Sequence, residues 1–67
     1  MNKEMILKDI ESKIDLITDN RKQKVIKTII SKKDWFKVIS YDTFISILND
    51  LGYSKEEYNN IYKRLII

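Results

Sequence analysis

Apolar side chains recur at intervals of three and four residues along most of the chain. Residues 3–18 are the first example, because they carry a series of apolar positions that fall on one face of a helix. These positions are Leu7, Ile10, Ile14 and Ile17. Stripes of the same kind follow in residues 21–33, 41–51 and from residue 54 onward. The pattern predicts a helical protein with amphipathic helices packed around one core.

Residues that favour helix ends stand where these stripes begin and stop. The pair at 19–20 is a turn or cap signal, and Ser40 is the expected N-cap of the third helix. Gly52 is the only glycine in the chain and directly follows the third stripe, as expected of a left-handed helix terminator. Ser54 and Glu57 have the spacing of a capping box, so they predict the start of the fourth helix.

The segment 34–39, which contains Trp35 and Phe36, fits either a helix extension or a short extended stretch. We favour a helix end near Asp34 followed by an irregular or extended link. The whole chain, residues 1–67, is expected to form a single all-α domain of three to four short helices with a helix-turn-helix-like C-terminal half. The expected core consists of Leu7, Ile10, Ile14, Ile17, Ile26, Ile29, Ile30, Phe44, Leu48, Leu51, Tyr58, Ile61 and Leu65.

The residue types that are missing argue against an enzyme. The chain has no Cys and no His, so it has no disulfide, no thiolate metal site and no Ser-His or Cys-His pair. One glycine cannot form a Gly-rich phosphate loop. We therefore expect no catalytic residues, no metal, no cofactor and no small-molecule substrate, and a function that depends on binding.

Hydropathy and residue bias give expectations about location and source. No apolar run approaches the 18 residues of a membrane span, and acidic residues interrupt the N-terminus where a signal peptide would be apolar. A cytoplasmic protein with no membrane contact is expected. Ile, Lys and Asn, whose codons are A/T-rich, supply 29 of the 67 residues. This bias points to a low-GC bacterium or its phages and plasmids.

Positive charge is concentrated in one segment. Residues 20–37 carry a net charge of +6, whereas residues 1–19 carry −2 and residues 38–67 carry −1. A basic helix on an otherwise acidic chain is a reasonable footprint for nucleic-acid phosphates. The expected phosphate contacts on this helix are Lys22, Lys24 and Lys27. The alternative is that these lysines only solvate a helix surface beside the acidic first helix.

The C-terminal half has the order of a DNA-binding motif. Residues 44–51 form one predicted helix, Gly52 and Tyr53 form a turn, and a second helix begins at Ser54. This segment resembles the general pattern of winged-helix and other helix-turn-helix regulators. The resemblance implies that the last helix reads double-stranded DNA with its outward side chains. The side chains in question are Lys55, Asn59, Asn60 and Lys63. A small DNA-binding regulator is the first hypothesis.

A small helical interaction module is the alternative hypothesis. Such a protein would act as an inhibitor, adaptor or antitoxin-like partner by covering a surface on a larger protein. Aromatic residues are enriched in binding hot spots, and Trp35, Tyr41 and Tyr62 are the candidates here. Homodimerisation through the stripe of residues 3–18 is a further option, although packing of that stripe within the chain is favoured.

Overall fold

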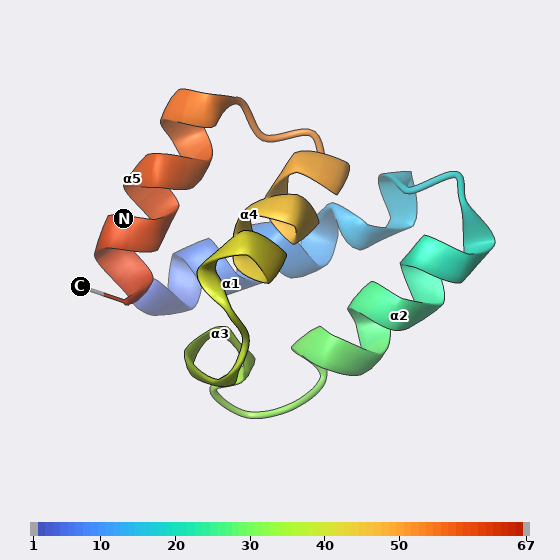
Figure 1. Cartoon of the computed structure of the whole chain (residues 1–67), viewed down its shortest axis with the longest axis horizontal. Coiled ribbons are helices and arrows are strands. Elements are labelled where there is room, and N and C mark those ends of the chain that lie inside the picture. Colours follow the sequence, from blue (N-terminus) through green and yellow to red (C-terminus); the bar gives the residue numbers. More distant parts are fainter. Residues whose placement is uncertain (1, 67) are drawn as a thin grey trace.

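The computed structural model describes residues 2–66, which form five α-helices and one 3-10 helix (Figure 1). They are α1 (Lys3–Ser12), the 3-10 helix η1 (Ile14–Leu16), α2 (Asn20–Ile30), α3 (Trp35–Val38), α4 (Tyr41–Asp50) and α5 (Lys55–Leu65). Residues 2–66 contain no strand, so the all-α prediction is confirmed. The number of α-helices is five, whereas the sequence led us to expect three or four.

The first apolar stripe does not form one continuous helix over residues 3–18, so that expectation is wrong. α1 ends at Ser12, whose hydroxyl donates a hydrogen bond to the carbonyl of Asp9 at 2.7 Å. The N–H groups of Leu16 and Ile17 then bond to carbonyls three residues earlier, which is the 3-10 pattern. A serine hydroxyl that bonds to the backbone competes with continued α-helix, and periodicity alone did not reveal that competition.

Residues 35–38 within the segment 34–39 are helical, so the irregular or extended link that we favoured there is wrong. α2 ends at Ile30, three residues before the predicted end, and Asp34 reverses the chain with a left-handed backbone (φ 55°). α3 then buries both Trp35 and Phe36. Neighbouring residues of an extended segment point to opposite faces. A helical turn lets both rings enter the same core, and their burial accounts for α3.

The predicted glycine position between α4 and α5 is confirmed. Gly52 has φ 95°, the left-handed region that a glycine adopts without steric cost. Its N–H donates to the carbonyl of Asn49 at 3.0 Å, and the N–H of Tyr53 donates to the carbonyl of Leu48 at 3.1 Å. These two hydrogen bonds form a Schellman motif, which ends α4 and turns the chain toward α5.

The predicted N-caps are confirmed as well. Ser54 Oγ accepts a hydrogen bond from the N–H of Glu57 at 3.3 Å, and Glu57 Oε1 accepts one from the N–H of Ser54 at 3.0 Å, which completes the capping box. Ser40 caps α4 by accepting from the N–H of Thr43, and Asp19 caps α2. Local side-chain chemistry therefore sets where three of the helices start.

The core is built around Phe44, which has no solvent exposure. The ring of Trp35 stacks on Phe44 with centroids 5.8 Å apart, and Tyr62 meets it edge-on at 5.7 Å. Of the expected core, these residues are buried: Ile10, Ile14, Ile26, Ile30, Phe44, Leu48, Leu51 and Leu65. The rest lie half-buried at its edge: Leu7, Ile17, Ile29, Tyr58 and Ile61. Buried residues outside the expected set are Ile6, Trp35, Phe36, Ile47 and Tyr53.

α1 and α4 occupy the middle of the molecule, and α2 and α5 lie on opposite sides of them (Figure 1). One polar cluster ties α1 to the turn that precedes α5. Tyr53 donates its hydroxyl proton to Asp9 Oδ2 at 2.5 Å, and Lys13 Nζ lies 3.1 Å from the same oxygen. The Lys13 ammonium also lies 4.0 Å from the centroid of the Tyr53 ring.

Candidate functional site

The basic residues of α2 are exposed, but two of the three lysines predicted to bind nucleic acid have acidic neighbours. Lys22 Nζ lies 3.5 Å from Asp50 Oδ1 on α4, and Lys27 Nζ lies 4.0 Å from Asp15 Oδ1 in η1. Lys24 makes no ion pair with any residue from 2 to 66. The acidic residues of neighbouring elements therefore reduce the positive potential that the sequence places on this helix.

The predicted base-reading residues on α5 differ in exposure. Lys55, Asn60 and Lys63 are exposed, whereas Asn59 is half-buried. Negative charge stands at the start of the same helix, in Glu56 and Glu57. The backbone N–H of Ser54, and then its side chain, hydrogen-bond to Glu57 and hold the pKa of that carboxyl below its usual range. The N-terminal end of α5 therefore keeps its negative charge at neutral pH, where a DNA-reading helix would approach phosphates.

The structure does not bring the two groups of predicted nucleic-acid-binding residues together. One group lies on α2 and the other on α5, and these helices flank the central α1 and α4 from opposite sides (Figure 1). A nucleic acid in contact with both groups would have to extend across most of the molecule, whose longest dimension is 31 Å. The two groups are better described as separate surfaces.

Two of the three aromatic residues predicted for a protein interface do meet. Tyr41 at the start of α4 and Tyr62 near the end of α5 have ring centroids 4.8 Å apart and perpendicular planes. Tyr41 is 49% exposed and Tyr62 is half-buried. Trp35 is only 4% exposed, so its indole belongs to the core and is not available to a partner.

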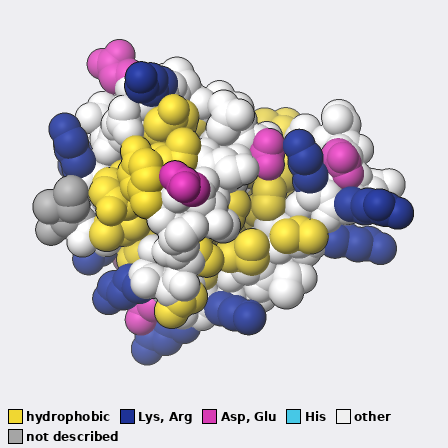
Figure 2. Space-filling model, in the orientation of Figure 1, with side chains coloured by type: hydrophobic (Ala, Val, Ile, Leu, Met, Phe, Trp, Pro, Cys, Tyr) yellow, Lys and Arg dark blue, Asp and Glu magenta, His cyan; other side chains and the backbone are white. Residues whose placement is uncertain are grey.

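Further apolar residues extend this tyrosine pair along both helices. Ile45 lies four residues after Tyr41 in α4, and Tyr58 lies four residues before Tyr62 in α5, so the members of each pair share a side of their helix. Ile66, the C-cap of α5, lies four residues after Tyr62 and donates its N–H to the carbonyl of Tyr62. We call these five residues the aromatic ridge. Figure 2 shows hydrophobic side chains gathered over α4 and α5 on the left of the molecule. Ile45, Tyr58 and Ile66 were not among the predicted site residues, although the four-residue spacing is visible in the sequence.

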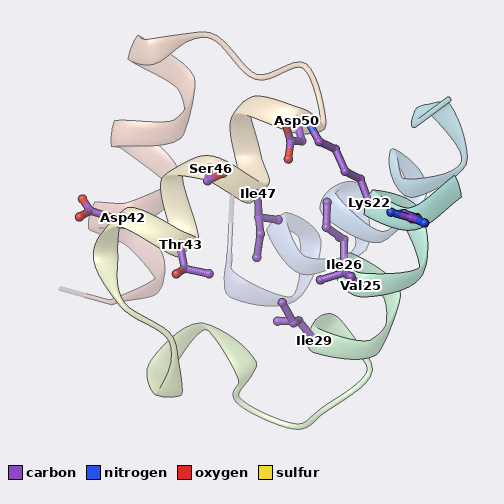
Figure 3. A pocket seen from close by; sticks show the side chains of 10 residues that line it. Lys22, Val25, Ile26, Ile29, Asp42, Thr43, Ser46, Ile47 and Asp50 are labelled. Atoms are coloured by element: carbon purple, nitrogen blue, oxygen red, sulfur yellow. Dashed lines mark ion pairs between the residues drawn. The ribbon is translucent and has the colours of Figure 1, made fainter. Parts of the chain in front are cut away.

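A groove of about 440 Å³ runs between α2 and α4 (Figure 3). Its floor is apolar, with Ile26 and Ile47 buried and Ile29 half-buried, and Val25 stands 58% exposed on the α2 side. Charged residues line its rim: Arg21, Lys22, Asp42 and Asp50. No sequence motif marks this groove, because it is formed by two helices that are separate in the chain.

A second cleft of about 380 Å³ lies between α1 and α5, around the Asp9–Tyr53 hydrogen bond. Tyr53 and Lys13 hydrogen-bond to Asp9 and lower the pKa of its carboxyl, in that order of importance. Burial, and then the bond to Asp9, raise the pKa of the Tyr53 hydroxyl. Tyr53 and Lys13 both donate hydrogen bonds to Asp9, so the polar groups of this cluster are partnered within the chain. The cluster therefore serves to hold α1 against the turn that precedes α5.

Residues 2–66 contain neither a candidate metal site nor a candidate membrane-spanning helix. That part of the chain has no group of three or more His, Cys, Asp or Glu side chains placed to hold a metal ion. None of its helices has both the length and the apolar character needed to cross a bilayer. Comparisons with protein-family models, curated proteins and solved structures found no match to this chain.

Proposed function

We propose that this chain is a small protein-binding module and that the aromatic ridge is its contact surface. The observation that carries the proposal is the perpendicular contact of Tyr41 and Tyr62. It joins two helices at the surface and leaves Tyr41 49% exposed to solvent. The predicted nucleic-acid residues, in contrast, are divided between two sides of the molecule.

The physical properties of the ridge suit recognition of a protein. A tyrosine supplies a large contact area with few rotatable bonds, so it loses little conformational entropy when it binds. The Tyr62 ring rests on the core ring of Phe44 at 5.7 Å, so the tyrosine pair is held in place before a partner arrives. Preorganised aromatic groups of this kind are common anchors of protein interfaces.

The test is a pull-down from a host lysate, with and without nuclease, using wild type and two matched variants. Tyr41→Asp removes the exposed ring but puts an acid in the first turn of α4, where the helix dipole favours it. Leu16→Asp makes a similar change at a residue in η1 that is 71% exposed. We expect a stoichiometric protein partner that survives nuclease, is retained by Leu16→Asp and is lost with Tyr41→Asp.

Two results would contradict the proposal. One is a capture that disappears entirely on nuclease treatment. The other is equal capture of the partner protein by wild type and by Tyr41→Asp, when circular dichroism shows that both proteins are folded. Tyr41→Phe is a second check, because it keeps the ring against Tyr62 and should retain the partner.

DNA binding is the second candidate function, and the exposure of Lys55, Asn60 and Lys63 on α5 favours it. Under this hypothesis α4, the Gly52 turn and α5 form a helix-turn-helix, and α5 is the helix that reads the DNA bases. In this case affinity for duplex DNA would fall steeply with salt, with a slope near −0.9 per neutralised phosphate. Lys63→Glu would weaken binding and flatten that slope. If the affinity for duplex DNA changes neither with salt nor with Lys63→Glu, DNA recognition by α5 is excluded.

A further inference from the structure

The α2–α4 groove combines an exposed apolar residue with charges of both signs on its rim. Lys22 and Asp50 already pair across one end of it at 3.5 Å. Arg21 and Asp42 also line the groove, and within residues 2–66 neither makes an ion pair. The rim thus retains one uncompensated positive charge and one uncompensated negative charge.

These two charges cannot neutralise each other within one molecule. Arg21 is in the first turn of α2, next to Lys22, and Asp42 is in the first turn of α4. Figure 3 shows Asp42 at the opposite end of the groove from Lys22 and Asp50. A binding surface with opposite charges at its two ends is complementary to itself when a second copy is turned by 180°.

We infer that this groove is the interface of a homodimer, in which Arg21 of each copy pairs with Asp42 of the other. In a two-fold interface every contact occurs twice, so one rotation forms both ion pairs. The same rotation covers Val25, which is 58% exposed in the single chain. The stripe in residues 3–18 cannot serve this role, because Ile10 and Ile14 are buried within the chain.

The size of the molecule sets the expected strength of this dimer. A standard interface buries about 800 Å² on each partner, which would be about one sixth of the 4844 Å² surface of this chain. The groove supplies few exposed apolar side chains, so a smaller interface and a reversible dimer are expected. Dissociation should be observable at micromolar to millimolar concentrations, about the range of small transient interfaces.

The test is sedimentation equilibrium of the purified full chain over that concentration range. Wild type should shift from the 8.1 kDa monomer toward twice that mass. Arg21→Glu alone and Asp42→Lys alone should each weaken the dimer by about tenfold or more, because each places like charges together at two symmetric contacts. The double variant Arg21→Glu/Asp42→Lys should recover most of the lost affinity. Val25→Lys should abolish association.

Lys24→Glu is the matched control, since it makes a similar charge change on α2 but outside the groove lining. It should dimerise like wild type. A wild type that is monomeric at every concentration overturns the proposal. So does a charge-swapped double variant that is weaker than both single variants, or a Lys24→Glu effect as large as that of Arg21→Glu. Circular dichroism confirms that each variant is folded, and no step involves the partner protein of the aromatic ridge.

Discussion

At the scale of single residues, the hydrogen bond from Tyr53 to Asp9 joins parts of the chain that are 44 residues apart. Tyr53→Phe removes only the hydroxyl and leaves the Asp9 carboxylate with Lys13 as its remaining partner. We expect a loss of about 1 kcal/mol in the free energy of unfolding, less than is usual for a bond to a charged group because Asp9 is partly solvated. Chemical denaturation of Tyr53→Phe, Asp9→Asn and the double variant measures the coupling. Additive effects would show that the two side chains do not interact.

The same cluster predicts how stability depends on pH. The pKa of Asp9 is lowered in the folded state, chiefly by the Tyr53 hydroxyl and then by Lys13. A lowered pKa contributes stability above the ordinary carboxyl value, about pH 4, and this contribution is lost as pH falls through the folded-state pKa. The stability difference between wild type and Asp9→Asn should therefore shrink below about pH 4. A difference that stays constant down to pH 2 would contradict this assignment. Glu57 titrates in both proteins and the charge of Asp9 is the smallest influence on its pKa, so most of its effect cancels in the difference.

Gly52 and Asp34 both have a left-handed backbone, and substitution is expected to change stability in opposite directions at the two positions. Gly52 has φ 95°, and a Cβ added there would meet no atom within 4 Å, so backbone strain alone sets the cost of substitution. Gly52→Ala should lower the free energy of unfolding by about 1–2 kcal/mol. Gly52→Asn should cost less, because Asn tolerates this conformation better. Thermal melts of both variants provide the comparison, and an equal loss for Ala and Asn would mean that strain at this turn is not the cause.

Asp34 is the opposite case, because a residue with a side chain already occupies a left-handed position (φ 55°). Asp34→Gly should relieve the strain and leave stability unchanged or raise it by up to about 1 kcal/mol. Asp34→Ala keeps the strain and loses the polar side chain, so it should destabilise. A destabilised Asp34→Gly variant would show that the aspartate side chain has a role beyond fitting this turn.

At the scale of elements, the sequence predicted what local chemistry determines. The caps at Asp19, Ser40 and Ser54 and the turn at Gly52 depend on residues within a few positions of each other, and all are present. The break after Ser12 and the helix α3 could not be predicted in this way. α3 spans four residues, Trp35–Val38, which is too short for periodicity, and its conformation follows from burial of two rings against distant helices.

The candidate surfaces show the same division between local and long-range information. Tyr41 and Tyr62 could be selected as surface aromatics from their types, but their contact depends on how α4 and α5 pack. The α2–α4 groove had no signature at all, because its floor is formed by Ile26 and Ile29 on one helix and Ile47 on another. Conversely, the seven basic residues of segment 20–37 were visible in the sequence. Their acidic neighbours in η1 and α4 were not.

At the scale of the whole molecule, the total stability is of the same order as the contribution of a single large core residue. At about 0.05–0.15 kcal/mol per residue, a chain of 67 residues has about 3–10 kcal/mol in total. A small chain buries a smaller fraction of its unfolded surface than a large one and should lie toward the low end of that range. The cooperativity of the fold therefore depends on its largest buried side chains, and the most central of these is Phe44.

Phe44→Ala should abolish the cooperative folding transition. The ring contacts Trp35 and Tyr62, and its removal should cost about 3–5 kcal/mol through lost burial and the cavity left behind. That loss is comparable to the whole stability of the chain, so a large unfolded population is expected at 25 °C. Trp35, the only tryptophan and normally buried, reports the change by a shift of its emission to longer wavelength. Phe44→Leu fills much of the same volume and should cost about 1 kcal/mol, with the transition retained. If Phe44→Ala unfolds as cooperatively as Phe44→Leu at a similar temperature, the aromatic cluster is not the centre of the fold.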